Sequence, residues 1–548
     1  MSETKENTIV NTIHITRFPP EPNGYLHLGH LKAMMFDFDL YGNDDLTKGS
    51  ECILRMDDTN PEAEKEEYVQ GIIDDVKWMG YRYSKLTYTS DYFDRLYECA
   101  VELIKMDCAY VDFSSPDEIK SMRHSGTESS HRSEPIDVQL TRFDDMKKGK
   151  YKEGEAVLRL KIDMTNVNHN LRDPIAYRIK YQSHHRTGNR WNIYPSYDYS
   201  HGLVDAFEGI TDSFCTMEFY VRRDQYYWPV LKLKDMFNLN PARVLEFGKL
   251  NVEGVVLSKR KIAPLIEANI VSGFDDPRLY TIRGLRRRGF TPEILKNIVS
   301  HTGMGRLKVT FGRADSTISR GLVDHELRTW LDRSSHRSFA VMDPINVTII
   351  DSESKERLSL HPNHPVDKSK GTHFTKLTDS IVIEKNDFRE VDSPDYYRLA
   401  PGKVIRLKYA DFVKYESHEK KNETTTITVK DCVPDKPKKI KGVVHWLSDD
   451  SPRAEFEIYD DLYDTDGNIK SESKINRFSG YVEKYVVDSI LENEMNLFQF
   501  ERLGYFKFDH FKRSTLDDLS SSIMKNGSDL IPVFIRTIEL TDTFNNKN

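Results

Sequence analysis

Two histidines and the glycine between them are the first residues whose types suggest chemistry. His27 and His30 are three positions apart, so on the first turn of a helix their side chains share one face. Gly29 lets backbone or a flat ligand approach closely. Imidazoles on such a face can donate hydrogen bonds to phosphate oxygens while charge develops during a reaction. The three residues therefore favour a site that acts on phosphate.

A second candidate segment lies far along the chain, after the apolar run 255–257. It consists of Ser258, Lys259, Arg260 and Lys261. Lys259 is a flexible point charge that suits a pyrophosphate in motion. Four such residues alone usually form a solvated loop. Their combination with the two histidines instead favours activation of a carboxylate by ATP.

Other interpretations of the histidine pair stay open at this point. The pair could ligate a metal, but its neighbourhood has no cysteine and no matching set of histidine and carboxylate. The two residues could also be ordinary surface histidines. No Gly-Lys-Ser/Thr follows the turn, which excludes a P-loop. A dinucleotide site lacks its Gly-x-Gly-x-x-Gly fingerprint.

The elements that must hold the pair are predicted from periodicity. Residues 12–16 alternate polar and apolar as a short strand does, and residues 31–40 have apolar side chains at helical spacing. This pattern is typical of the first βα unit of an open parallel sheet, where ligands bind beyond the carboxyl ends of the strands. The N–H groups at the helix start suit phosphate. A second helix is predicted over 61–80, capped by Asn60.

Length and composition bound the class of protein. A chain of 548 residues is too long for one core, so several domains are expected. The chain is 30% charged and 38% hydrophobic, and no apolar run is long enough to span a bilayer. The N-terminus lacks the apolar stretch of a secretory signal, and the five cysteines form no Cys-x-x-Cys pair. We therefore expect a cytoplasmic protein with no structural metal and no membrane partner.

The net charge of −8 argues mildly against nucleic acid as a partner. It is a sum over the whole chain, however, and an RNA surface needs only a local basic stripe. Candidate stripes are 147–150, 286–288 and 436–441, although each alone is more often a solvated face.

Changes in composition and periodicity divide the chain into six segments. A polar tail that we expect to be disordered comes first. The two halves of one α/β parallel-sheet domain follow, with an insertion between them. A helical segment then leads to many short runs of period two, which predict antiparallel barrels. The predicted boundaries, in chain order, are 1–11, 12–110, 111–190, 191–261, 262–335 and 336–548.

Both chemical segments resemble the two signature motifs of class I aminoacyl-tRNA synthetases. The motifs here are His27 to His30 and Leu257 to Lys261. The sequence around the two motifs is similar to that of the glutaminyl members, and the similarity runs in order from about Thr12 to about Asp542. The segments that carry it are 19–27, 56–61, 172–174, 194–201, 208–211, 275–278 and 284–289.

The resemblance implies a fold and a reaction. The fold would be multidomain: an α/β Rossmann-type catalytic domain, an inserted acceptor-stem-binding domain over 111–190, a helical connector, and two β-barrels that hold the anticodon. The reaction would join L-glutamine to tRNA(Gln) through an adenylate, with Mg²⁺ accompanying ATP and held mostly by phosphates and water. We expect a monomer, with a multi-synthetase assembly as the alternative.

The resemblance also assigns residues by position. It gives catalysis to His27, His30 and Lys259. ATP contacts fall on Glu21, Pro22, Asn23, His27, Gly29, His30, Lys32, Ala33, Thr216, Lys249, Leu250, Ser258, Lys259 and Arg260. Amino-acid contacts fall on Arg17, Asp57, Tyr197, His201 and Cys215. Anticodon contacts fall on Arg337, Arg398, Arg406 and Gln499, which without the resemblance are equally well exposed strand residues.

Two of these assignments also have a direct physical reason. A substrate carboxylate needs a fixed cation, and Arg17 stands at the end of the first predicted strand. A substrate ammonium needs an anion, which Asp57 can supply, although its segment is also a loop and helix cap.

The nearest competing family is that of the eukaryotic and archaeal glutamyl-tRNA synthetases. Three features follow the glutaminyl pattern: the segment 21–24, His201 and Cys215. At position 215 the glutamyl form tends to carry an Arg, which would pair with a γ-carboxylate. The segment 224–228 looks more like the glutamyl group. A catalytically silent tRNA-binding protein is a third hypothesis.

Three positions depart from the glutaminyl pattern. Val244 replaces a Gln near the amide pocket, which leaves open how the amide is oriented. Val221 replaces an Asp that reads acceptor-stem base pairs in bacterial relatives, and Tyr397 replaces a Lys at the anticodon end.

Overall fold

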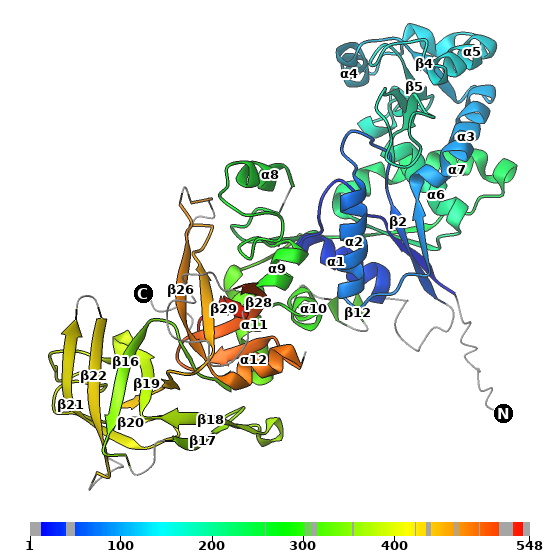
Figure 1. Cartoon of the computed structure of the whole chain (residues 1–548). Coiled ribbons are helices and arrows are strands. Elements are labelled where there is room, and N and C mark those ends of the chain that lie inside the picture. Colours follow the sequence, from blue (N-terminus) through cyan, green and yellow to red (C-terminus); the bar gives the residue numbers. More distant parts are fainter. Residues whose placement is uncertain are drawn as a thin grey trace, which may run out of the picture.

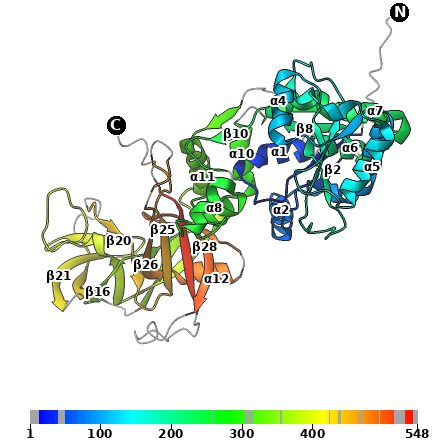
Figure 2. The same ribbon diagram turned by 90° about the horizontal axis from the view of Figure 1, so that it is seen from above.

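The computed structural model in Figure 1 is an elongated molecule with a helical and parallel-sheet half at one end and two curled sheets at the other. Figure 2, seen from above, separates the same two ends. The predicted tail, Ser258, the side chain of Lys259 and most of the basic run 436–441 lie outside the described residues. The structure describes residues 13–39, 50–257, 259–301, 304–305, 308–309, 315–352, 356–421, 424–434, 440–464, 468–470, 472–492, 494–513 and 530–540.

A parallel sheet forms the base of the first half. Strands β1 (Ile15–Phe18), β2 (Glu51–Met56) and β3 (Lys85–Tyr88) pair in that order, all parallel. A second parallel pair, β8 (Asp212–Thr216) and β9 (Arg243–Phe247), adjoins β1, where the Thr211 amide donates to the Ile15 carbonyl at 2.9 Å. The parallel-sheet prediction is confirmed. The first strand begins three residues later than predicted, and helix α1 (Leu28–Asp39) begins three residues earlier.

The second predicted helix is shorter than expected. Helix α2 (Glu66–Trp78) begins after Lys65, whose side chain makes no capping hydrogen bond. The predicted start at Pro61 and the cap at Asn60 are wrong. The carboxylate of Glu64 turns back to accept a hydrogen bond from the Asn60 amide at 2.6 Å, so residues 61–63 form a turn instead.

An antiparallel sheet interrupts the parallel one in the sequence. Its core is shared with helices α6 (Tyr197–Glu208) and α7 (Arg223–Phe237), and Tyr177 and Tyr194 are buried there. The sheet thereby fixes the two helices that lead into and out of β8. Its strands are β4 (Ala109–Asp112), β5 (Val157–Leu160), β6 (Ile175–Ile179) and β7 (Ile193–Pro195), with helices α3 (Phe93–Lys105), α4 (Pro116–Ser125) and α5 (Ile136–Lys147) around them.

The next segment returns to the first core. Its helices pack in the same apolar cluster as Leu28 and Leu31 of α1. Two backbone hydrogen bonds fasten it to the turn before α1: the Leu28 amide donates to Tyr280 at 3.1 Å, and the Ile282 amide donates to Leu26 at 2.9 Å. Its elements are β10 (Leu250–Val252), α8 (Lys259–Glu267), α9 (Ile282–Arg288), α10 (Pro292–Ser300), β11 (Met304–Gly305), β12 (Lys308–Val309), β13 (Ser316–Ile318) and α11 (Arg320–Ser334).

The second half consists of two curled seven-stranded sheets. Most pairs in them are antiparallel, as predicted, but β14 with β27, β25 with β29, β16 with β22 and β20 with β23 are parallel. One sheet has β14 (His336–Ser338), β27 (Leu497–Phe500), β28 (Gly504–Arg513), β29 (Leu530–Ile538), β25 (Arg453–Tyr459), β26 (Ile475–Val482) and β15 (Ala340–Val341). The other has β23 (Val443–Val444), β20 (Val404–Leu407), β21 (Phe412–Lys421), β22 (Thr424–Cys432), β16 (Pro344–Ile350), β19 (Ser380–Glu384) and β24 (Leu447–Ser448).

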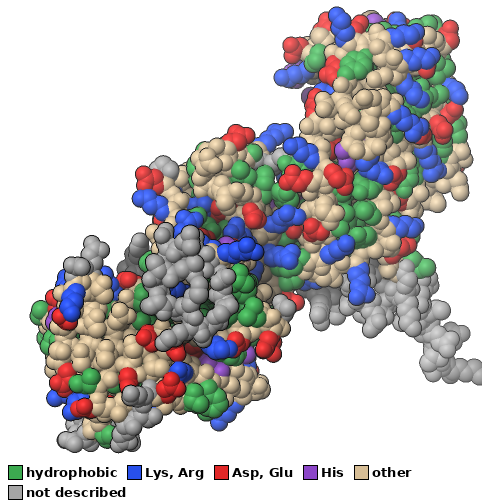
Figure 3. Space-filling view, viewed as in Figure 1, with side chains coloured by type: hydrophobic (Ala, Val, Ile, Leu, Met, Phe, Trp, Pro, Cys, Tyr) green, Lys and Arg blue, Asp and Glu red, His purple; other side chains and the backbone are tan. Residues whose placement is uncertain are grey.

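A hairpin and a helix complete this half: β17 (Glu356–Pro362), β18 (Thr372–Thr378) and α12 (Lys484–Leu491). Figure 3 shows Lys and Arg side chains mixed with Asp and Glu side chains along the visible face, so the net negative charge does not make this face uniformly acidic. Among the helices that the structure describes, none combines the length and the apolar character needed to cross a bilayer.

Candidate active site

The two histidines at the start of α1 face each other as neutral rings. Their ring centroids are 3.9 Å apart. Nδ1 of His27 accepts a hydrogen bond from the Gly29 amide, and Nδ1 of His30 accepts one from the His27 amide, each at 3.1 Å. Burial lowers the pKa of His30 to about 4 and that of His27 well below its ordinary value. The one proton of each neutral ring is therefore on Nε2, which can donate a hydrogen bond without carrying a charge.

The turn that carries these rings has no spare room. A Cβ atom at Gly29 would lie 3.0 Å from the His27 ring and 3.2 Å from the Leu250 carbonyl oxygen. Lys32, one turn further along α1, is buried and donates to the Gly248 carbonyl at 2.7 Å. Lys32 therefore ties α1 to the chain before β10, and Ala33 packs against the apolar core. The predicted contacts of Lys32 and Ala33 with ATP stay predictions.

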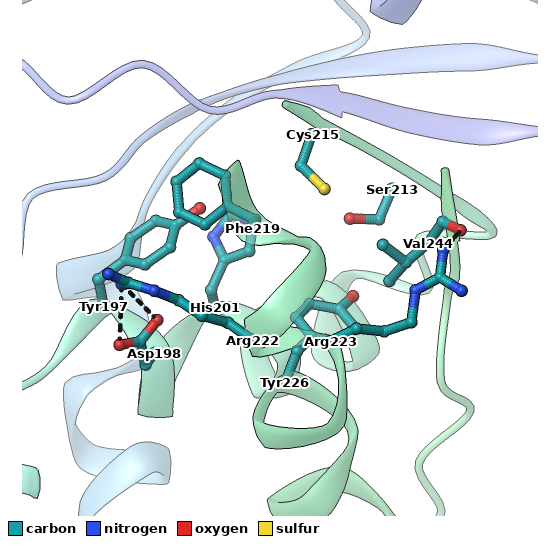
Figure 4. A pocket seen from close by; sticks show the side chains of 10 residues that line it. All are labelled: Tyr197, Asp198, His201, Ser213, Cys215, Phe219, Arg222, Arg223, Tyr226 and Val244. Atoms are coloured by element: carbon teal, nitrogen blue, oxygen red, sulfur yellow. Dashed lines mark hydrogen bonds and ion pairs between the residues drawn. The ribbon is translucent and has the colours of Figure 1, made fainter. Parts of the chain in front are cut away.

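Three of the five predicted amino-acid residues line one cavity, drawn in Figure 4. Tyr197 and His201 come from α6 and stack with ring centroids 4.6 Å apart, and Cys215 comes from β8. About 410 Å³ of space not filled by atoms lies in the cavity and its opening to solvent together. Its other lining residues, which the sequence analysis did not assign to the pocket, include Ser213, Phe219 and Tyr226. The strand alternation of 213 and 215 was the signal that could have added Ser213.

Arg17 lies beside this cavity and is not one of the residues that line it. Its guanidinium is fully buried and donates to Asp205 at 3.0 Å, to the Phe214 carbonyl at 3.0 Å, and to Ser213 Oγ and His201 Nε2 at 2.6 Å each. Arg17 therefore holds the side chains of His201 and Ser213 in place through these hydrogen bonds. Because His201 accepts through Nε2, its proton is on Nδ1. Burial holds the pKa of His201 well below its usual value. Direct binding of a substrate carboxylate by Arg17 stays a prediction.

Asp57 is a buried carboxylate with weak internal partners. Its two hydrogen bonds from hydroxyl groups, Thr89 at 3.4 Å and Thr59 at 3.5 Å, are long. Burial raises its pKa to about 7, against the opposing effect of Arg55, and the charges of Glu21 and Asp58 raise it further. A cation close by would restore the charged form. This environment suits the ammonium group that the sequence analysis assigned to Asp57.

Most of the remaining predicted ATP residues contact other residues of the protein. Thr216 donates to Glu218 at 2.9 Å, and the Lys249 ammonium contacts the same carboxylate at 2.5 Å. Asn23 donates to Glu21 at 2.5 Å, and the Pro22 carbonyl accepts from the Lys65 amide at 3.2 Å. Leu250 is buried in β10, and Arg260 is exposed in the first turn of α8. Their contacts with ATP stay predictions.

Three of the four predicted anticodon residues lie near the junction of the two curled sheets. Arg337 in β14 and Gln499 in β27 are direct register partners, although they are far apart in sequence. Arg398 forms an ion pair with buried Asp387 at 2.7 Å. Arg502, which the sequence analysis missed, holds the same carboxylate with two hydrogen bonds of 2.6 and 2.8 Å. The fourth predicted residue, Arg406, is exposed in β20.

Two described groups of histidines and carboxylates have possible ligand atoms within 4.8 Å of one another. In the first, His184 already accepts two amide hydrogen bonds at Nδ1 and contacts the Asp58 carbonyl through Nε2 at 2.9 Å. In the second, Glu483 accepts from the Phe339 amide and from His361 and His373. These hydrogen bonds account for His184 and Glu483, whereas both ring nitrogens of His185 are buried and have no hydrogen-bond partner among the described residues. The expected absence of a structural metal stays a prediction.

Comparisons with known proteins agree on one family. Models of the class I tRNA synthetases (E and Q) match residues 14–319 as catalytic domain, and residues 335–433 and 443–509 as anticodon-binding domains. The glutamine–tRNA ligase of Lupinus luteus is 40% identical over 97% of this chain and 65% of that protein. The glutamine–tRNA ligase of Nitrosomonas europaea is 39% identical over 96% of this chain and 94% of that protein.

The chain spans less than two thirds of the length of the Lupinus relative. Among solved structures, a glutamate–tRNA synthetase of Elizabethkingia anophelis matches with a TM-score of 0.42 and 19% identity, over 59% of this chain and 72% of that one. That likeness is too low to support an argument about the site.

Proposed function

The chain belongs to the class I tRNA synthetases of the E and Q group, and from that premise we propose that it is a glutamine–tRNA ligase. It activates L-glutamine with ATP, which gives glutaminyl-adenylate and pyrophosphate. It then transfers the glutaminyl group to the terminal ribose hydroxyl of tRNA(Gln). The names of the two relatives above support this proposal.

The charges of the groups that line the cavity favour glutamine over glutamate as the substrate. His201 is neutral, and burial raises the pKa of the Cys215 thiol to about 12, so it is neutral as well. Arg222 and Arg223, the two arginines that line the cavity, are paired with Asp198 and Glu246. A buried γ-carboxylate would find no unpaired cation among these groups, whereas an amide requires none.

The imidazole pair supports the ATP half of the proposal. The substrate carboxylate attacks the α-phosphate in line, and the Nε2–H groups of His27 and His30 donate to phosphate oxygens. Both rings are held in place by backbone amides before ATP arrives. A contact arranged in advance in this way can contribute about 3 kcal/mol to the transition state. Mg²⁺ enters with ATP, held mostly by phosphates and water.

Domain roles follow from the same proposal. The parallel-sheet segments 12–110 and 191–261 catalyse, the inserted segment 111–190 holds the acceptor stem, and 262–335 connects. The curled sheets of 336–548 read the anticodon, with Arg337, Arg398, Arg406 and Gln499 at unpaired bases. Arginine and glutamine side chains can hydrogen-bond the edges of such bases.

The test is ATP–pyrophosphate exchange with glutamine and with glutamate, each with and without total tRNA. We expect exchange with glutamine, dependent on tRNA as the resemblance implies. Exchange with glutamate alone would replace the proposal by a glutamate–tRNA ligase. No exchange with either amino acid, together with salt-sensitive tRNA binding, would leave a tRNA-binding protein without catalytic activity.

A further inference from the structure

An ion pair forms one side of the amino-acid cavity. Arg223, at the start of α7, lines the cavity, and its side chain runs toward Val244 in Figure 4. Its Nε donates to Glu246 at 2.7 Å, and its Nη2 contacts the second oxygen of the same carboxylate. Nη2 also donates to the Val244 carbonyl at 3.3 Å. The side chain of Glu246 is 6% exposed and that of Arg223 is 35% exposed, so solvent reaches part of the guanidinium but little of the carboxylate.

An unpaired arginine in this position would favour the binding of glutamate, which the pocket must reject. A guanidinium with free donors binds a carboxylate by two parallel hydrogen bonds, which is the strongest common way to hold a γ-carboxylate. Glu246 already occupies that arrangement. An entering glutamate would have to displace a carboxylate of the protein, and the displaced group would be left buried without a partner.

The charges of Arg223 and Glu246 both affect the pKa of the Cys215 thiol, which lines the cavity. Burial is the largest cause of its raised pKa. Among nearby charges, Arg17 lowers this pKa most, Glu246 raises it, and Arg223 lowers it. Glu246 therefore offsets, at the Cys215 thiol, the stabilisation of an anion by Arg223.

The second cavity arginine provides an internal contrast. Nη1 of Arg222 donates to both oxygens of Asp198 at 3.1 Å, so this pair uses one nitrogen where Arg223 uses two. Its side chain is 44% exposed and that of Asp198 is 27% exposed. Water therefore screens this second pair, and its effect on a bound carboxylate should be weaker.

We propose that Glu246 determines amino-acid specificity by holding Arg223, so that the cavity presents no free guanidinium to glutamate. This inference rests on the proposed function. Glu246 is a positioning residue in this scheme, because it acts on the substrate only through Arg223.

The experiment replaces Glu246 by Gln and compares kcat/KM for charging tRNA with glutamine and with glutamate. Glu246→Gln keeps the shape and removes the charge. We expect the preference for glutamine over glutamate to fall by about tenfold or more, through a lower KM for glutamate. The double variant Arg223→Gln/Glu246→Gln removes the freed cation as well and should recover most of the preference.

The matched control is Asp198→Asn, which makes the same change at the exposed pair and should shift the preference less than Glu246→Gln does. Glu246→Asp keeps the charge but is too short to hold both nitrogens, and it should give an intermediate preference. This variant also carries the test if Glu246→Gln does not fold, which thermal unfolding would reveal.

An unchanged preference in the Glu246 variants that fold would overturn the inference, and so would a double variant as relaxed as the single one. These failures differ from a failure of the proposed function. In that case the wild-type protein itself would not charge tRNA with glutamine.

Discussion

The amino-acid cavity and the junction of the two curled sheets treat their buried polar groups in opposite ways. Beside the cavity, the guanidinium of Arg17 has four hydrogen-bond acceptors. At the junction, Nη1 of Arg337 and Oε1 of Gln499 are buried and have no hydrogen-bond partner in the part of the chain that the structure describes. Buried polar atoms without partners are rare in folded proteins. Arg17 is therefore fully hydrogen-bonded without a ligand, whereas Arg337 and Gln499 retain unused hydrogen-bonding capacity.

The contrast fits what each region is proposed to bind. A small substrate that must react needs groups fixed in advance, because reorganising them during the reaction would raise the barrier. An RNA loop brings its own donors and acceptors on splayed bases, which can satisfy groups that the protein leaves open. We expect substitutions of the first kind of site to affect stability strongly and those of the second to affect recognition.

The largest expected effect is on folding, at the carboxylate next to the cavity. Asp205 accepts from Arg17, Arg55 and Tyr226, all of them buried or nearly so. Asp205→Asn leaves two buried arginines short of charge and should lower the free energy of unfolding by about 3–5 kcal/mol. Denaturant titration measures this. Asp387→Asn is the matched change at the junction and should lower it less, because its arginines are 42% and 29% exposed. Equal losses would break the comparison.

The next effect separates stability from recognition at two glutamines, of which Gln139 is buried and Gln499 is half-buried with a buried Oε1. Gln139 is paired at both ends, with the Val111 amide and the His131 carbonyl, each at 2.7 Å. Gln139→Met should lower the free energy of unfolding by about 2 kcal/mol. Gln499→Met removes an oxygen without a partner and should lower it little. Gln499→Met should instead reduce kcat/KM for tRNA charging by about tenfold. A Gln499→Met protein that unfolds easily but charges normally would contradict our interpretation.

A third prediction tests how tightly the imidazole turn is fixed. Gly29→Ala adds a methyl group 3.0 Å from the His27 ring and 3.2 Å from the Leu250 carbonyl. The ring has to shift, and pyrophosphate exchange should slow by about tenfold. Gly321→Ala is the control, because a Cβ there meets only Ser319 Oγ at 3.8 Å. If both variants exchanged pyrophosphate at the wild-type rate, the turn would be less constrained than its contacts indicate.

The smallest effect is on pH dependence. The pKa of His30 is about 4 in the folded protein, below the ordinary value of 6.5. The unfolded chain therefore binds more protons between these two values, so this group makes stability fall as pH decreases from 6.5 toward 4. His30→Gln should flatten the curve of unfolding free energy against pH in that window only. Identical curves for the variant and the wild-type protein would show that His30 is not neutral by burial.

Local patterns in the sequence were enough to predict the parts of the site that are close along the chain. His27 lies directly before α1 and His30 in its first turn, and their rings meet as the spacing of three predicted. Tyr197 and His201, which only the resemblance assigned to the pocket, are four apart in α6 and stack. The period of the apolar residues likewise predicted a parallel sheet first and mostly antiparallel sheets later. These features depend on geometry within a few residues.

Only the tertiary structure decided the rest. It set the charge state of the two imidazoles, because burial comes from segments as distant as residues 250 and 280. It placed Arg17 beside the cavity and made Arg337 and Gln499 register partners in one sheet. It paired Arg223 with Glu246. It also moved the start of α2, because the buried side chain of Glu64 turned back to the chain. Periodicity fixes which face of an element is apolar, but which partner meets that face, and whether a charge there is paired, depends on the packing of the whole chain.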